Sequence, residues 1–299
     1  MKWDEMRRSD EVEDRRDERG GFGLGGGGGF SGFGGFRLSG TAIIIVIVVS
    51  VLLGKNPLVI LSYLQGGSPV QVTQHAAPTQ AKAPPVEDQT AQMVRAVLGD
   101  TEDVWGKLFA EAGKTYTRPR LVLFRGAVQS ACGRATSAVG PFYCSGDQKV
   151  FIDLEFFDEL HQRFGAPGDF AQAYVIAHEV GHHVQNLIGV TQQVAEKGDG
   201  ASEKVRNALS VRQELQADCF AGVWGHSAQS RNLLEAGDLD EALRAANAIG
   251  DDRLQQEAQG HVSPDSFTHG TSAQRIHWFK VGFESGQISQ CNTFKVAHL

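Results

Sequence analysis

The sequence lacks the surplus of basic residues that most nucleic-acid-binding proteins carry. Its 299 residues include 28 Lys and Arg against 35 Asp and Glu, which gives a net charge of −7 at pH 7. No basic stripe interleaved with aromatic residues appears, so we expect no nucleic-acid partner. Strand–helix–strand alternation and internal repeats are also missing, which argues against a doubly wound sheet or a repeat protein. The 41% hydrophobic content is enough to build a globular core.

Cysteine is scarce, with only Cys132, Cys144, Cys219 and Cys291. None of them has Cys-x-x-Cys spacing, so a cysteine-based zinc site is not expected. An even number fits disulfides in an oxidising compartment, with four buried thiols as the alternative. Three pairings are possible. Closeness in the sequence favours Cys132 with Cys144, which leaves Cys219 to pair with Cys291.

The N-terminal residues 1–37 show little apolar periodicity. Residues 1–19 are dense in charges of both signs, and residues 20–36 are rich in Gly and Phe. Such compositions are typical of disordered chain, because they offer too little apolar surface to bury. We therefore expect residues 1–37 to form a disordered tail.

An apolar run follows at residues 38–54, which contain no charge and consist mainly of Ile, Val and Leu. Its length is at the short end of what a helix needs to cross a bilayer. Two alternatives fit this run less well. A cleaved signal peptide would start near residue 1 and end in a small-residue site, and a buried core helix would have globular neighbours on both sides. The sequence therefore predicts one transmembrane helix, followed by a linker at residues 55–90 that is rich in Gly, Pro and Gln.

Lys and Arg near a membrane span favour the cytoplasmic side, whereas Asp and Glu count little. Only Lys55 and Lys82 follow the span before Arg95, whereas the tail contains Lys2, Arg7, Arg8, Arg15, Arg16, Arg19 and Arg37. We expect a single-pass protein of the inner (cytoplasmic) membrane, with its tail in the cytoplasm. Residues 91–299 would then face the periplasm or the outside.

Residues 91–299 have the pattern of an α+β domain that is mostly helical and contains a small sheet. Short apolar runs predict strands at 121–124 and 150–154. A mixed stretch at 153–164 suits a helix. Apolar residues at helical spacing predict further helices at about 91–108, 169–189, 203–227, 238–249 and 271–284.

The most specific motif is His178-Glu179-Val180-Gly181-His182, an HExxH sequence inside a predicted helix. Residues four apart on a helix share one face, so both imidazoles can bind one metal ion, with Glu179 beside the metal-bound water. This arrangement is typical of zinc proteases. Gly181 is costly in a helix interior, which indicates that another element packs closely against it.

A catalytic zinc ion needs a third protein ligand, and Glu214 on the next long helix can provide it. Asp218 lies one turn further along the same face. We expect Glu214 to bind Zn²⁺ and Asp218 to accept a hydrogen bond from the outer nitrogen of His178. His183 faces another direction, so we expect it in packing or at the surface.

HExxH followed by Glu-x-x-Ala-Asp at residues 214–218 resembles the gluzincin class of metalloproteases. Together with His183 and the segment Phe-Thr-His-Gly-Thr-Ser-Ala-Gln-Arg at residues 267–275, these motifs resemble the bacterial family called putative neutral zinc metallopeptidases. The last segment is also similar to the Thr-His-Pro stretch of membrane-associated gluzincins, with Gly270 in place of Pro. The resemblance covers the whole chain and implies a zincin-like fold, a zinc peptidase activity and one N-terminal membrane anchor.

Two residues of the last segment have open roles. His269 either donates a hydrogen bond to the oxyanion of a tetrahedral intermediate or has a structural role, such as capping a helix. Arg275 either forms an ion pair that holds the segment or contacts the substrate, and we favour the ion pair.

The sequence thus predicts a zinc-dependent metallopeptidase with a polypeptide substrate. Zn²⁺ would be held by His178, His182 and Glu214, with Glu179 as general base on the activated water. The substrate would lie extended along a sheet edge, with strands 121–124 and 150–154 as candidates. The alternative is a membrane-tethered zinc-binding module that is catalytically silent or very narrowly specific.

Overall fold

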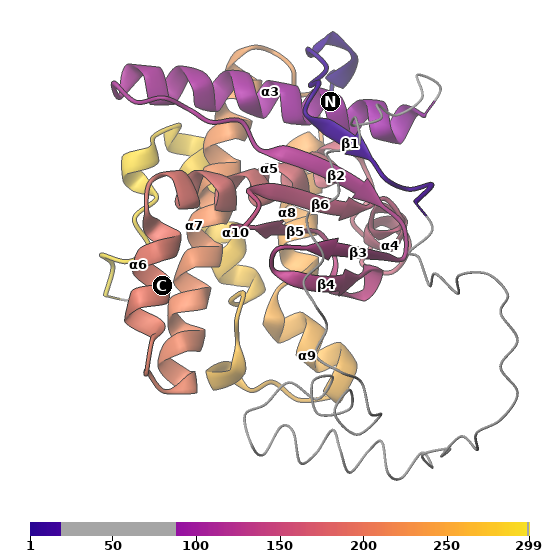
Figure 1. Ribbon diagram of the computed structural model, residues 1–299. Helices are drawn as coiled ribbons and strands as arrows, with labels where there is room; N and C mark the ends of the chain where they lie inside the picture. Colours follow the sequence, from indigo (N-terminus) through magenta and orange to yellow (C-terminus); the bar gives the residue numbers. More distant parts are fainter. Residues whose placement is uncertain (19–87, 298) are drawn as a thin grey trace, which may run out of the picture. The chain divides into compact units, whose positions relative to one another are not determined.

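A four-stranded sheet forms one layer of the fold. In the computed structural model, which describes residues 1–18, 88–297 and 299, the strand order is β1-β2-β6-β5. The central strands β2 (Arg120–Phe124) and β6 (Lys149–Asp153) are parallel. Strand β1 (Val12–Asp14) pairs in parallel with β2, and β5 (Phe142–Cys144) pairs antiparallel with β6 (Figure 1).

Both faces of the central strands are covered, which explains why they are apolar at nearly every position. Leu121 and Ile152 belong to the main core with the helices. Val122 belongs to a second core, which it shares with the hairpin of β3 (Ala127–Ser130) and β4 (Gly133–Thr136).

The helices form the larger layer, in which α5 (Asp169–Leu187) packs on α7 (Glu203–Ser230) and α7 packs on α10 (Ser272–Ser285). The contact between α7 and α10 requires glycine, because a Cβ on Gly282 would lie 1.9 Å from the carbonyl oxygen of Cys219. The other helices are α3 (Gln89–Glu111), α4 (Glu155–Gln162), α6 (Val190–Gly198), α8 (Asp238–Ala248) and α9 (Asp251–Gln259). Short 3-10 turns lie at Trp3–Glu5, Ser137–Val139, Pro264–Ser266 and Ile288–Gln290.

The expected α+β class with a small sheet is confirmed, as are the two predicted strands. The sequence did not predict β3, β4 or β5, because strands of three or four residues show too little alternation to detect. Both favoured disulfides are present: Cys132–Cys144 joins the β3–β4 hairpin to β5, and Cys219–Cys291 joins α7 to the C-terminal segment.

The predicted transmembrane helix at 38–54 lies outside the described residues, as do residues 19–37 and the linker up to residue 87. Within residues 1–18, 88–297 and 299, none of the helices combines the length and the apolar character that a bilayer crossing requires.

Residues 1–18 are folded, so the expectation of a disordered tail is wrong for this part. They belong to the same compact unit as the rest of the described chain. Ser9 is fully buried, and its hydroxyl donates to Glu102 at 2.5 Å. The carboxylate of Glu13 is also buried and accepts from Arg120 at 3.0 Å. The charges that resemble a solvated tail in the sequence are therefore paired with side chains distant along the chain.

Gly99 of α3 allows a test of how residues 7–9 dock. A Cβ on Gly99 would lie 2.4 Å from the carbonyl oxygen of Arg7. Gly99→Ala should lower the free energy of unfolding by about 1–3 kcal/mol through overpacking, measured by urea denaturation. On the same helix a Cβ on Gly106 meets nothing within 4 Å. Gly106→Ala should therefore raise the free energy of unfolding by up to about 1 kcal/mol; equal effects of the two substitutions would contradict the docking.

Candidate metal centre

Helix α5 carries the HExxH motif in its buried middle part, where His178 and Glu179 are less than 8% exposed. Gly181 faces α7, and a Cβ there would lie 3.0 Å from the carbonyl oxygen of Ala217. The predicted close packing at Gly181 is therefore confirmed. It brings the backbone of α7 against the motif, so that residues on either side of Ala217 can reach the two histidines.

Three potential ligand groups converge between α5 and α7. His178, His182 and Glu214 each offer one atom, and these atoms all lie within 4.8 Å of one another. The two carboxylate oxygens of Glu214 lie 3.1 Å from Nε2 of His178 and 3.4 Å from Nε2 of His182. The structure thus brings together the three residues that the sequence predicts as zinc ligands.

The outer nitrogen of each imidazole is already engaged. Nδ1 of His178 donates to Asp218 Oδ1 at 2.8 Å, as expected, and Nδ1 of His182 lies 2.9 Å from Oε1 of Gln185. Both rings can therefore present Nε2 to a cation. Two imidazole nitrogens and one carboxylate form a donor set that fits a catalytic zinc ion. Gln185 was not predicted from the sequence, where its only signal is its position three residues after His182 on the same helix face.

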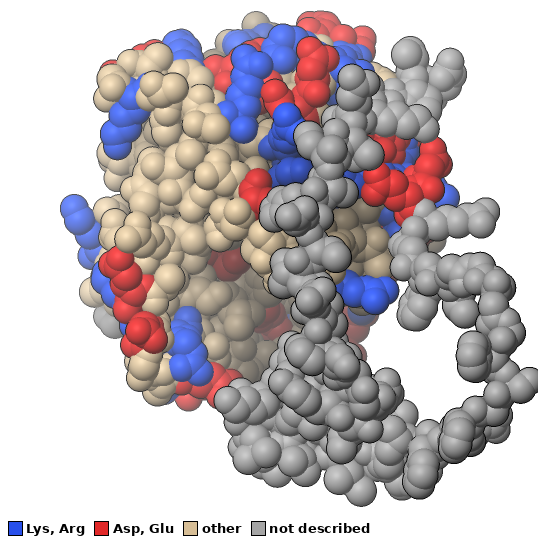
Figure 2. Space-filling view, in the orientation of Figure 1, with Lys and Arg blue, Asp and Glu red and all other residues tan. Residues whose placement is uncertain are grey.

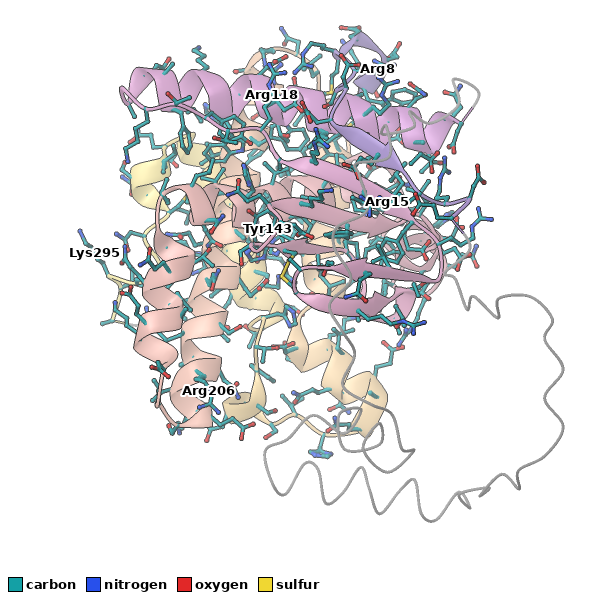
Figure 3. The ribbon with its side chains drawn as sticks, in the orientation of Figure 1. Arg8, Arg15, Arg118, Tyr143, Arg206 and Lys295 are labelled. Atoms are coloured by element: carbon teal, nitrogen blue, oxygen red, sulfur yellow. A yellow bond between two sulfur atoms is a disulfide. The ribbon has the colours of Figure 1, made fainter. Side chains whose placement is uncertain are left out.

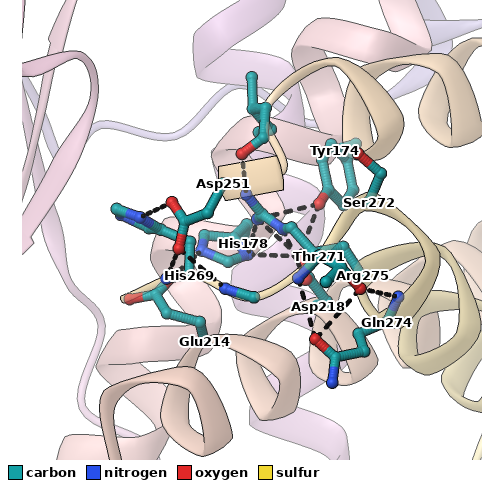
Figure 4. A network of polar contacts seen from close by, with 12 residues as sticks. Tyr174, His178, Glu214, Asp218, Asp251, His269, Thr271, Ser272, Gln274 and Arg275 are labelled. Carbon is teal, nitrogen blue, oxygen red and sulfur yellow. Dashed lines mark hydrogen bonds and ion pairs between the residues drawn. The ribbon is translucent and has the colours of Figure 1, made fainter. Parts of the chain in front are cut away.

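Asp218 is the centre of a buried polar network (Figure 4). Its Oδ1 accepts from the hydroxyl of Tyr174 at 2.5 Å, and Arg275 donates to both carboxylate oxygens at 2.9 Å. Burial would raise the pKa of Asp218, but Arg275 and His178 outweigh burial and hold this pKa well below its ordinary value. Arg275 thus forms an ion pair, the role that we favoured from the sequence. The contribution of Tyr174 to this network was not predicted.

The protonation states of the metal-free site follow from its charges. Burial would raise the pKa of Glu214, but the two histidines outweigh it and hold this pKa well below its ordinary value. Burial would lower the pKa of His178, but Asp218 and Glu214 raise it to about 10. The metal-free site therefore pairs anionic Glu214 with a protonated His178, and zinc binding must release protons.

The site opens into a cavity of about 620 Å³. Its lining includes the three candidate ligands together with Glu179 and His269, the residues to which the sequence analysis assigns catalytic roles. Residues 137–143, between the β3–β4 hairpin and the end of β5, also line this cavity. A bound substrate would therefore contact both the metal centre and this segment.

His269 is held by Asp251, the first residue of α9. Nδ1 of His269 lies 3.1 Å from Oδ1 of Asp251, while Oδ2 accepts from the backbone N–H groups of Thr268, His269 and Gly270 at 2.7, 2.6 and 3.2 Å. The hydrogen bond that Asp251 accepts from Nδ1 of His269 raises the pKa of His269. Asp251 was not predicted from the sequence, because its contact with His269 crosses 18 residues that carry no local signal of it.

Strand β5 is tied to α5 through Tyr143, which Figure 3 labels near the centre of the view. The Tyr143 hydroxyl donates to Nδ1 of His183 at 3.0 Å and accepts from Asn186 at 3.2 Å. Nε2 of His183 donates to the carbonyl oxygen of Thr117 at 2.6 Å, and burial lowers the pKa of this fully buried histidine. The sequence allowed His183 either a packing role or a place at the surface, and the structure shows the packing role.

Sequence comparisons found relatives that match most of the chain. The chain is 52% identical over 294 residues to the uncharacterized protein YpfJ of Escherichia coli K12, which covers 98% of this chain and 99% of that protein. It is 40% identical over 266 residues to the uncharacterized protein Rv2575 of Mycobacterium tuberculosis H37Rv, which covers 84% of this chain and 86% of that protein. No solved structure matches the chain. Residues 1–294 match the family model described as "Putative neutral zinc metallopeptidase", and the chain therefore belongs to this family.

Proposed function

We propose that this chain is a zinc-dependent metallopeptidase that hydrolyses peptide bonds. The observation that carries the proposal is the convergence of His178, His182 and Glu214 in a cavity that Glu179 also lines. A zinc ion held by these three residues would polarise a water molecule and the scissile carbonyl group. The family of the chain supports both the metal and the class of reaction.

The residues around the cavity then have separate tasks. Glu179 takes a proton from the attacking water and later returns it to the leaving amine. His269 donates a hydrogen bond to the oxyanion that forms on the scissile carbonyl. Asp218 keeps the His178 ring oriented by accepting from its Nδ1 at 2.8 Å.

The substrate would add to the sheet along β5, not along the two strands that the sequence suggested. Strands 121–124 and 150–154 correspond to β2 and β6, and each of these has a neighbouring strand on both sides. Their backbone groups are therefore already paired and cannot bind an extended peptide. Among the described strands, β5 is the edge next to α5, and its residues Phe142 and Tyr143 line the cavity.

The proposal is tested with the full-length chain purified in detergent. Its zinc content and its cleavage of casein are measured as isolated, after chelation, and after zinc is added back. We expect about one zinc per chain and cleavage that disappears and returns with the metal. Zinc without cleavage of casein or of a peptide library would favour a catalytically silent or narrowly specific module. A chain that binds no zinc would refute the metal site.

The pair of Asp251 and His269 predicts a change in the pH profile. Asp251 raises the pKa of His269, so the protonated donor persists to higher pH than in a free histidine. Asp251→Asn removes this effect, and the alkaline limb of kcat/KM should move to lower pH. The acidic limb should stay in place, because the substitution changes none of the groups at the metal centre. The measurement is kcat/KM for one peptide from pH 5 to 10, and an unshifted alkaline limb would remove His269 from the mechanism.

We also propose that the domain works outside the cytoplasm, at the outer face of the inner membrane, where the apolar residues 38–54 would hold it. Two disulfides support this location, because such bonds are rare in reducing compartments.

A further inference from the structure

The two histidines of the HExxH motif are held by different groups. His178 donates to the carboxylate of Asp218, whereas His182 faces the neutral amide of Gln185 at 2.9 Å. Gln185 is completely buried, so water cannot replace its hydrogen bonds. The orientation of this amide therefore decides which nitrogen of His182 carries a proton.

Main-chain carbonyl groups determine how the amide points, because they can only accept hydrogen bonds. Nε2 of Gln185 donates to the carbonyl oxygen of Gln213 at 2.7 Å. Nε2 of Gln216 donates to the carbonyl oxygen of Cys291 at 2.9 Å, which turns the Gln216 oxygen toward Nε2 of Gln185 at 3.1 Å. Gln185 must therefore present its oxygen to His182, and this oxygen requires a proton on Nδ1.

The last acceptor in this chain of hydrogen bonds is itself fixed to α7. Cys291 is fully buried and forms a disulfide with Cys219, one turn beyond Gln216. Two residues further, the Thr293 hydroxyl donates to the carbonyl oxygen of Arg212 at 2.6 Å. The C-terminal segment is thus fixed to α7 at Cys291 and again at Thr293, which keeps the carbonyl oxygen of Cys291 in place for Gln216.

We propose that Gln185 is the positioning residue of His182, held in this role by Gln216 and the carbonyl group of Cys291. The inference rests on the proposed zinc site and adds a residue to it. With Nδ1 protonated and bonded to Gln185, His182 keeps the lone pair of Nε2 free for the cation. A neutral amide also orients this ring without adding another carboxylate to Glu179, Glu214 and Asp218.

Gln185→Met tests the proposal in the full-length chain, because it preserves the volume but removes the acceptor. Zinc affinity is measured by competition with a chelator, so no turnover is needed. We expect binding to weaken about 10- to 100-fold. In zinc-loaded protein with ¹⁵N-labelled histidine rings, the Nδ1 proton of His182 should lose its signal to exchange, while that of His178 persists. Gln92→Met, at a buried glutamine of α3, is the matched control and should bind zinc like the wild type.

Gln216→Met should show the same two changes to a smaller degree, and it replaces Gln185→Met if that variant does not fold. Wild-type affinity in the Gln185 and Gln216 variants would overturn the proposal. Weaker binding with an unchanged His182 signal would also overturn it, because the loss would then come from general packing. A wild-type chain without zinc would refute the proposed zinc site, and this inference with it.

Residues 1–18 form main-chain hydrogen bonds with the rest of the domain. The N–H of Leu121 donates to the carbonyl oxygen of Glu11 at 2.9 Å, and the N–H of Ser9 donates to that of Arg95 at 2.9 Å. Arg7 bonds to Glu102 at 2.7 Å. Figure 2 shows Lys, Arg, Asp and Glu side chains gathered at the top of the view, where Figure 1 places α3 and the N-terminal segment.

Such contacts cannot form across a membrane, whose hydrocarbon core is about 30 Å thick. A chain that crossed the bilayer once between residues 18 and 88 would leave β1 and β2 on opposite sides. From the pairing of β1 with β2, we infer that residues 1–18 and residues 88–299 face the same compartment. This inference replaces the expectation, drawn from the distribution of Lys and Arg, that the tail lies in the cytoplasm while residues 91–299 lie outside.

Single cysteines in the full-length chain test the shared compartment. Asp10 has a side chain that is 98% exposed and Lys107 one that is 77% exposed, so Asp10→Cys and Lys107→Cys are accessible positions on the two segments. Each variant is treated with a membrane-impermeant maleimide in right-side-out spheroplasts and in inside-out vesicles. A cytoplasmic enzyme with an exposed cysteine serves as the control for leakage.

We expect both cysteines to react in the same preparation, which the two disulfides predict to be the spheroplasts. Reaction of Asp10→Cys in the vesicles and of Lys107→Cys in the spheroplasts would overturn the inference, and so would the reverse.

Discussion

Glu179→Gln should reduce kcat for peptide cleavage by about 10²- to 10⁴-fold, the usual contribution of a general base. The carboxylate lines the cavity of the metal centre but is not one of the three converging ligands. The amide of Gln has the same size and cannot take a proton from water. The variant should therefore bind zinc and substrate much like the wild type, which is measured by zinc content and by KM.

His261→Gln is a matched control, because His261 is exposed and lies outside the lining of the cavity. Wild-type turnover of the Glu179 variant would refute the proposed mechanism, whereas loss of zinc would show that Glu179 supports the metal site instead. The same variant, because it binds without cleaving, can trap substrates in the cell envelope for identification.

Asp218→Asn should lower the free energy of unfolding by about 3–5 kcal/mol, because it leaves the buried Arg275 guanidinium without its counter-ion. Arg275 is only 2% exposed, so water cannot take over this role. Zinc affinity should fall as well, since His178 loses its anionic acceptor. Urea denaturation of the metal-free protein measures the first effect without the second.

An exposed ion pair provides the control for Asp218. Lys204 and Asp265 pair at 3.0 Å, with both side chains 73% exposed. Asp265→Asn should therefore change stability by less than about 1 kcal/mol. Similar losses in the two variants would mean that the network around Asp218 contributes no more than a surface contact.

Acid should weaken the same network. The pKa of Asp218 is lowered in the folded protein, so its stabilising contribution is present above the pKa of an unfolded Asp. This contribution is lost as the pH falls toward the folded-state pKa. The difference in stability between the wild type and Asp218→Asn should accordingly shrink at low pH.

The candidate ligands could be predicted because helix geometry connects spacing in the sequence to position in space. His178 with His182, and Glu214 with Asp218, are each one turn apart, so each pair shares a face of its helix. The packing of α7 at Gly181 then brings the two pairs together. The disulfide pairs followed from proximity in the sequence for Cys132 and Cys144, and by elimination for the other two cysteines.

The supporting residues could not be predicted in the same way. Gln185 acts through Gln216 and a carbonyl group of the C-terminal segment, and this partner is distant in the sequence. Asp251 reaches His269 through a loop whose path has no local signal. Which strand forms the sheet edge also depends on pairing, and the short β5 has little pattern of its own.

The N-terminal segment is the clearest example of a feature that depends on the tertiary structure and could not be predicted from the sequence. The amino-acid sequence by itself determined most of the helices, though not α6 or α9, together with the two central strands and the zinc-ligand motif, because these depend on periodicity within one element. Only the tertiary structure decided that residues 1–18 complete the sheet, since their charges find partners only after α3 and β2 are in place. It also decided that Gln185 orients His182 and that β5 borders the cavity, because both depend on contacts between segments distant in the sequence.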